Sequence, residues 1–138
     1  MEVRRLVASR RVRFGLVVAY AAYLFVASVV DPPSNALSPA GPLGLVGLDK
    51  WLHAVAYAGL AFAVAYAILA HTPRDYLVVV LAAVAFGAGI EVVQYGLPER
   101  AFDVADMAAN AVGAVLATAC WWATVRVTGL SPPPDDNA

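Results

Sequence analysis

Four long apolar runs dominate the sequence and limit the folds it can adopt. They lie at about residues 14–30, 51–70, 76–95 and 105–127. A transmembrane α-helix needs about 20 mostly apolar residues, so runs of this kind are suited to crossing a bilayer. The chain is 62% hydrophobic and only 14% charged, which is typical of an integral membrane protein. We therefore expect an all-α, polytopic membrane protein whose four transmembrane helices form one small bundle.

The segments between and around these runs set the expected ends of the helices and divide the chain into an N-terminus, a membrane domain and a tail. Residues 31–48 are rich in proline and glycine, which favours an irregular external loop. Pro73 is expected to end the second helix, and Gly96 to Pro98 to end the third. We predict a basic N-terminus over 1–13, a membrane domain over 14–127 and a disordered tail over 128–138.

The arginines predict how the helices are oriented in the membrane. Four spans place both termini on one side, and a cytoplasmic N-terminus would put seven of the nine lysines and arginines in the cytoplasm. Only Lys50 and Arg100 would then lie outside, which satisfies the positive-inside rule. A cleaved signal peptide is the alternative for the first run, but that run is long and no small-x-small cleavage site follows it. We expect a multi-pass protein of the cell membrane with both termini cytoplasmic.

Polar residues of the second, third and fourth spans gather at one end of this predicted topology. The second helix begins outside, the third ends outside and the fourth begins outside. Polar side chains at membrane depth are costly, so they mark a working site or a polar interface between helices. The predicted ligand-binding residues are Asp49, Lys50, His53, Glu91, Gln94, Arg100, Asp103, Asp106 and Asn110.

Spacing indicates which way several of these side chains point. Glu91 follows Ala83 and Gly87 at intervals of four, so it should face the bundle with the small residues and not the lipid. The polar face of the fourth helix shows intervals of three, four, three and four. Its members are Asp103, Asp106, Asn110, Gly113 and Ala117.

Each polar residue also has a purely structural interpretation. Asp49 is well placed to cap the second helix, and Asp103 and Asp106 could only stabilise the start of the fourth. Lys50 could extend to the lipid headgroups. His53 lies one turn after Asp49 and could bond to it.

The remaining structural interpretations concern the third and fourth helices. Asn110 could bridge two helices through a hydrogen bond. Glu91 is the hardest to explain in this way, because a carboxylate on an apolar helix must be paired, hydrated or protonated. Its natural partners are Arg100 and His53.

Two kinds of chemistry fit the predicted cluster. In a binding protein, Arg100 and Lys50 would meet a phosphate, while Gln94 and Asn110 would donate or accept neutral hydrogen bonds. The protein would then hold a lipid headgroup, a lipid-linked envelope precursor or a ligand with a lipid tail.

In an enzyme, His53 and Glu91 would form an acid/base pair, and Asp103 or Asp106 would orient the histidine. The candidate catalytic residues are His53, Glu91 and Asp106. The cluster has no nucleophilic serine or cysteine, since Cys120 lies in an apolar run at the other end, where we expect it to be buried.

Other functions fit less well. His53, Glu91 and an aspartate are suitable ligands for a divalent metal, but no recognised metal motif is present, so we assign no metal and no cofactor. An ion pathway is the weakest interpretation, because the cytoplasmic halves of the four spans lack ionisable groups. The N-terminal arginines adjoin a membrane span with no basic domain behind it, which argues against nucleic acid as a partner.

The order and spacing of these residues resemble the VanZ-like family of small membrane proteins. The similarity covers roughly residues 49–117, and it includes Tyr57 and Gly113 together with the polar positions named above. Pro98-Glu99 departs from a more usual Pro-Gly before Arg100. The resemblance implies a membrane fold, a set of signature residues and a link of the family to teicoplanin resistance. It implies no established reaction.

Overall fold

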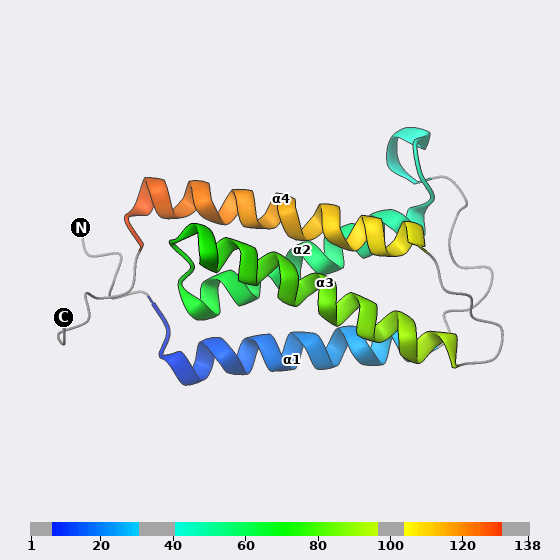
Figure 1. Ribbon diagram of the computed structural model, residues 1–138, viewed down its shortest axis with the longest axis horizontal. Helices are drawn as coiled ribbons and strands as arrows, with labels where there is room; N and C mark the ends of the chain where they lie inside the picture. The colour runs from blue at the N-terminus through cyan, green and yellow to red at the C-terminus, as the bar shows by residue number, and fades with distance from the viewer. Residues whose placement is uncertain (1–6, 31–40, 97–103, 131–138) are drawn as a thin grey trace.

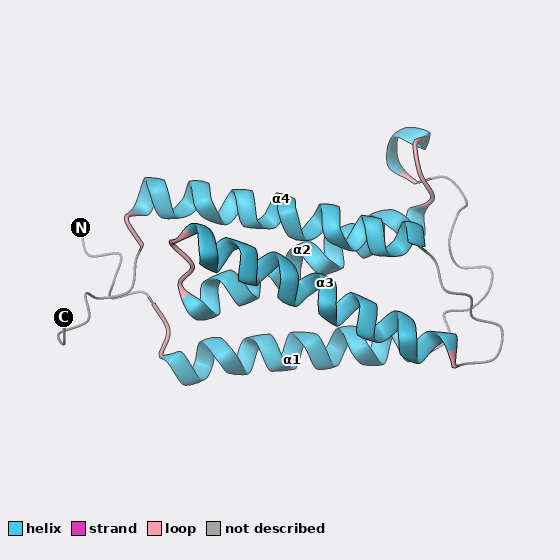
Figure 2. Ribbon diagram, in the orientation of Figure 1, coloured by secondary structure: helices cyan, strands magenta, loops and turns pink. Residues whose placement is uncertain are grey.

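The computed structural model describes residues 7–30, 41–96 and 104–130, and every element in that part of the chain is helical (Figures 1 and 2). A single 3₁₀ turn, η2 (Pro42–Gly44), precedes the second long helix. The long helices are α1 (Arg10–Val29), α2 (Leu48–Ile68), α3 (Pro73–Tyr95) and α4 (Val104–Thr128). All four are long and apolar enough to cross a membrane, which confirms the predicted fold class.

The helices run alternately in opposite directions, so their ends form two groups (Figure 1). One end of the bundle holds the start of α1, the end of α2, the start of α3 and the end of α4. We call it the arginine end, because it carries Arg10, Arg11, Arg13, Arg74 and Arg126. The opposite end holds Val29, Leu48, Tyr95 and Val104, and we call it the polar end.

Local capping explains where the helices begin. The N-cap of α2 is Gly47, so the expectation that Asp49 caps this helix is wrong, and Asp49 lies within the first turn. Pro73 also differs from expectation. The helix before it ends at Ile68, and Pro73 is the first residue of α3, where a missing backbone N–H costs nothing. Thr72 and Asp75 complete a capping box at this start.

Small residues bring α2, α3 and α4 into close contact at the polar half of the bundle. Gly113 of α4 lies against the backbone of Ala54 in α2, and no side chain would fit between them. Gly87 of α3 lies against both Tyr57 and Asn110. These contacts place the predicted polar face of α4 towards α2. Asn110, Gly113 and Ala117, which the spacing placed on one face, are all buried.

The arginine end is held together by hydrogen bonds to helix carbonyls. Arg13 donates to the carbonyl oxygens of Tyr66 (3.0 Å) and Ala67 (2.8 Å), which fastens α1 to the end of α2. The indole N–H of Trp121 donates to Ala70 O at 2.8 Å, so this side chain is part of the core. Cys120, expected to be buried, is exposed on the outside of α4.

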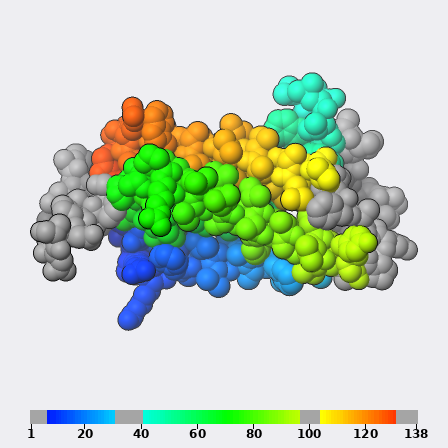
Figure 3. Space-filling model, viewed as in Figure 1, coloured from blue at the N-terminus to red at the C-terminus, as the bar shows by residue number. Residues whose placement is uncertain are grey.

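Helix α1 is the least buried of the four and packs mainly against α2. Its outer surface carries large apolar side chains such as Leu16, Val18 and Phe25. The face formed by α3 and α4 is turned to the viewer in Figure 3. It is similarly apolar, with Leu77, Leu81 and Leu116 exposed. Apolar surface of this extent around a small bundle is what a lipid environment requires.

Candidate functional site

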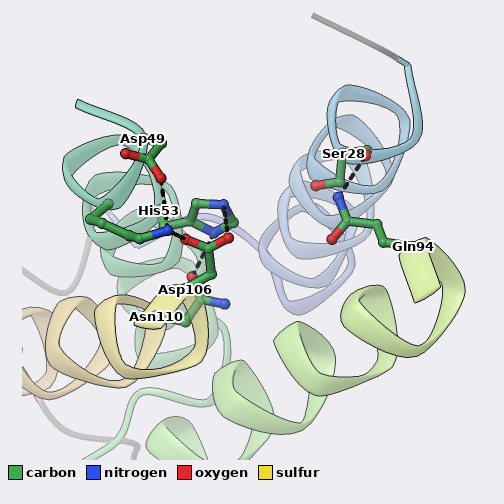
Figure 4. Close-up of polar contacts among 7 residues, drawn as sticks. Ser28, Asp49, His53, Gln94, Asp106 and Asn110 are labelled. Atoms are coloured by element: carbon green, nitrogen blue, oxygen red, sulfur yellow. Dashed lines mark hydrogen bonds and ion pairs between the residues drawn. The ribbon is translucent and has the colours of Figure 1, made fainter. Parts of the chain in front are cut away.

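A lysine held between two aspartates forms the centre of the polar end (Figure 4). The Lys50 ammonium lies 2.5 Å from Asp106 Oδ1 of α4 and 2.7 Å from Asp49 Oδ2 of its own helix. Lys50 and Asp106 are mostly buried, with 19% and 17% of their side chains exposed, whereas Asp49 is 48% exposed. Lys50 therefore links α2 to α4 and does not simply extend into the headgroups.

His53 lies one turn further along α2 and contacts α4 through both ring nitrogens. Its Nδ1 is 3.0 Å from Asn110 Oδ1, and its Nε2 is 3.5 Å from Asp106 Oδ2. The Asn110 oxygen can only accept, so Nδ1 must carry the proton in this bond. Nε2 is therefore the nitrogen that can exchange a proton with Asp106 or with a ligand. We refer to Asp49, Lys50, His53, Asp106 and Asn110 as the polar cluster.

Aromatic and acidic side chains continue from the polar cluster into the bundle. Tyr57 stacks on His53, with ring centroids 6.3 Å apart and an interplanar angle of 11°. Glu91 of α3 is 2% exposed, so it faces the bundle as the spacing predicted, and it lies close enough to Tyr57 to interact with it electrostatically. Between described residues no ion pair joins Glu91 to His53, and the assignment of these two as an acid/base pair stays a prediction.

Gln94 does not join the polar cluster but ties α3 to α1. Its side-chain amide donates to the backbone carbonyl of Ser28 at 2.8 Å, near the end of α1 (Figure 4). That carbonyl lies in the last turn of the helix, where no backbone N–H inside the helix can reach it. The sequence gives no signal for this bond, because Ser28 takes part through its backbone.

A groove of about 580 Å³ separates the Gln94–Ser28 pair from the polar cluster. Its walls are α1 from Tyr20 to Ser28 and α2 from Asp49 to Tyr57, and Gln94 and Asp106 also line it. We call it the α1–α2 groove. Its volume falls within the range of about 300–1,000 Å³ that is common for ligand pockets.

The structure thus brings together five of the nine predicted site residues, all on α2 and α4. Glu91 and Gln94 lie on α3 nearby, and Gln94 reaches the groove. Arg100 and Asp103 lie outside the described residues. The sequence offered Asp49, Glu91 and an aspartate of the fourth helix as partners of His53. In the structure its partners are Asp106, which was among these, and Asn110, which was not.

The chemistry available at the polar cluster is hydrogen bonding and proton transfer. Within the described ranges, no three histidine, cysteine, aspartate or glutamate side chains are arranged to hold a metal ion. The donors and acceptors come from two helices that pack closely at Gly113, so helix packing and not a ligand brings them together. Such preorganisation lowers the cost of binding.

Comparison with known proteins agrees with this architecture. No curated protein and no solved structure matches the chain. The family described as VanZ/LLP1, however, matches residues 7–126. This match extends beyond the polar residues to the first helix and to nearly the whole of α4. The chain therefore belongs to the VanZ/LLP1 family.

Proposed function

We propose that this VanZ-like membrane protein binds a lipid- or cell-envelope-related ligand at the polar end, and that this end faces the outside of the cell. The observation that carries the proposal is the α1–α2 groove, which opens beside the polar cluster. Polar groups at membrane depth are otherwise rare, and here they border a space large enough for a ligand.

The distribution of charge supports the proposed orientation. In the part of the chain that the structure describes, all the arginines lie at the arginine end, and Lys50 lies at the polar end. Loops and chain ends that carry an excess of lysine and arginine next to a span usually lie on the cytoplasmic side. The polar end would consequently face away from the cytoplasm, where envelope precursors and external amphiphiles are found.

Acid/base catalysis on a lipid-linked substrate is a second candidate function, favoured by the geometry of His53. The bond from Nδ1 to Asn110 leaves Nε2 directed towards Asp106, 3.5 Å away. A substrate hydroxyl between these two groups could lose its proton to Nε2, with Asp106 stabilising the imidazolium that forms. In this version His53 and Asp106 are the acid/base pair, and Asn110 orients the histidine.

Thermal unfolding of the purified full chain tests the proposal. The probes are lipid phosphates, lipid-linked envelope precursors and teicoplanin, the last because of the family's link to resistance. We expect one of these classes to raise the Tm of the wild type. His53→Ala should fold but lose that shift, and the matched control His71→Ala, at the arginine end, should keep it.

The same experiment separates a binding protein from a purely structural cluster and from an enzyme. If no probe shifts the wild type and His53→Ala merely melts earlier, the polar cluster is structural and the proposal fails. If a probe binds and is also converted, conversion should disappear in His53→Gln while the Tm shift remains. That result would favour the enzyme over the binding protein.

A further inference from the structure

A second groove lies between α3 and α4 towards the arginine end, where the start of α3 and the second half of α4 lie side by side (Figure 3). Its volume is about 610 Å³, and we call it the α3–α4 groove. On α3 it is lined by Tyr76, Leu77 and Val80, and on α4 by residues between Val115 and Trp122. It shares no lining residue with the α1–α2 groove.

The surface of the α3–α4 groove suits a hydrocarbon chain and not a polar ligand. Lining residues such as Leu77, Val115 and Ala119 have only carbon in their side chains. The Thr118 hydroxyl is already used, because it donates to Ala114 O of its own helix at 2.7 Å. The groove therefore offers apolar packing and almost no hydrogen bonding to an occupant.

The α3–α4 groove also has the depth of one leaflet. Its innermost residue on α4, Val115, precedes Arg126 by eleven residues. At a rise of 1.5 Å per residue this is about 16 Å along the helix, and one leaflet contributes roughly 15 Å of hydrocarbon. With Arg126 at the level of the headgroups, a chain in the groove would end near the bilayer centre.

Two arginines flank the outer end of this groove. The guanidinium carbon of Arg126 lies 4.3 Å from the centre of the Trp122 ring, and Trp122 lines the groove. Arg74 is exposed in the first turn of α3, three residues before the lining residue Leu77. Residues three apart are neighbours on a helix surface, so one arginine lies on each side of the groove.

The described residues around these arginines leave a net positive charge. Within the described ranges, neither Arg74 nor Arg126 pairs with a carboxylate. The acidic residue that the described segments place at the arginine end is Asp75, whose carboxylate accepts from the backbone N–H groups of His71 and Thr72. Two arginines against one aspartate favour an anionic group at the mouth of the groove.

We propose that the α3–α4 groove holds one hydrocarbon chain of an anionic phospholipid, with its phosphate between Arg126 and Arg74. The donors of arginine match the geometry of phosphate, and basic pockets between transmembrane helices recognise anionic lipid heads. The apolar groove selects a lipid over free phosphate, and the net charge selects an anionic lipid over a zwitterionic one. This site lies at the opposite end from the polar cluster, so it does not depend on the proposed function.

Photo-crosslinking of the full chain in phosphatidylcholine nanodiscs tests the inference. The probes are phosphatidylglycerol and phosphatidylcholine that carry the same diazirine-bearing chain, each added at the same low fraction. Mass spectrometry should place the phosphatidylglycerol crosslinks on residues 76–80 and 115–122, at about fivefold or more above phosphatidylcholine. Arg126→Gln combined with Arg74→Gln should abolish this preference.

Matched controls separate the site from general effects of charge and size. Arg10→Gln combined with Arg11→Gln removes the same charge from exposed positions of α1 and should keep the preference. Ala119→Trp fills the groove and should remove most of the phosphatidylglycerol labelling. Ala108→Trp, exposed on α4 at the polar end, should leave the labelling unchanged. All these substitutions are at exposed residues, so the variants should melt like the wild type.

Contrary results would overturn the inference in different ways. Equal labelling by the two lipids would make the bound chain ordinary boundary lipid. A preference that survives the loss of Arg74 and Arg126, or labelling that survives Ala119→Trp, would place the lipid elsewhere. Stabilisation by inorganic phosphate equal to that by phosphatidylglycerol would remove the hydrocarbon chain from recognition. No labelling of the groove by either lipid would assign it to another occupant, such as a second copy of the chain.

Discussion

At the scale of single residues, the two ion pairs of Lys50 differ in burial and should differ in energy. Asp106 is largely shielded and joins two helices, whereas Asp49 is about half exposed and belongs to the same helix as Lys50. Exposed ion pairs contribute about 0.2–1 kcal/mol, and hydrogen bonds to charged groups in shielded positions about 1.5–3 kcal/mol. The Lys50–Asp106 contact should therefore dominate.

This contrast gives a matched pair of substitutions. Asp106→Ala should lower the free energy of unfolding by about 2 kcal/mol, because it removes the shielded partner of Lys50 that links α2 to α4. Asp49→Ala should lower it by less than about 1 kcal/mol. Reversible unfolding in mixed micelles measures both. Equal losses would show that the link between α2 and α4 does not depend on this contact.

The protonation of the His53 ring is a second prediction for single residues. Asn110 accepts from Nδ1, so the ¹⁵N NMR spectrum of histidine-labelled protein should show a protonated Nδ1 for His53. Asn110→Ala should remove this preference and cost about 1 kcal/mol, because the partly buried Nδ1–H of His53 loses its partner. His71→Asn assigns the signals by removing the other histidine. An Nε2–H tautomer in the wild type would contradict the proposed role of Asn110.

At the scale of helices, the close approach of α2 and α4 should depend on one glycine. A methyl group at Gly113 would collide with the Ala54 carbonyl, so Gly113→Ala should force the helices apart and cost about 1–3 kcal/mol. Gly89→Ala in α3 is the matched control, because its methyl group would meet nothing within 4 Å. The control should be neutral or slightly stabilising, since alanine is the better helix former.

Unfolding and ligand binding together test this prediction. The contacts of Lys50 and His53 with α4 depend on the same helix pair, so Gly113→Ala should also weaken any ligand-induced Tm shift. If Gly113→Ala and Gly89→Ala behave alike, the crossing of α2 and α4 is not held by this contact.

Much of each helix could be predicted from the sequence, but its partners could not. Apolar length and intervals of three and four residues predicted four helices and the buried face of α4, because both depend on helix geometry alone. The same patterns offered Asp106 as a partner of His53, but they also offered Asp49 and Glu91 and did not identify Asn110. The rotation and depth of neighbouring helices decide which side chains meet. Here the close packing of Gly113 against Ala54 sets how α2 and α4 face each other.

The groove and the start of α2 were not predicted for related physical reasons. The groove exists because α1 is tied at Arg13, Tyr20 and Ser28 and lies apart from α2 between the last two. All three of these bonds use backbone carbonyls, which every residue carries, so no residue type marks the acceptors. Helix α2 begins two residues before Asp49, with Gly47 as its N-cap, and the Asp49 carboxylate pairs with Lys50.

At the scale of the whole molecule, charge and polarity separate along the bundle. The arginines of the described segments lie at one end, and the polar cluster with its groove lies at the other. The central claim is that the polar cluster is a site open to the outside and not a sealed contact between helices. Its rim residue Asp49 is about half exposed, so a probe in water should reach it.

Cysteine labelling in intact cells tests this claim most directly. In a Cys120→Ser background, Asp49→Cys should react with a membrane-impermeant thiol reagent added outside. Arg74→Cys, exposed at the arginine end, should react only after the cells are permeabilised. Asp49→Cys labelling only after permeabilisation would reverse the orientation, and no labelling of it even in detergent would show that the polar end is closed.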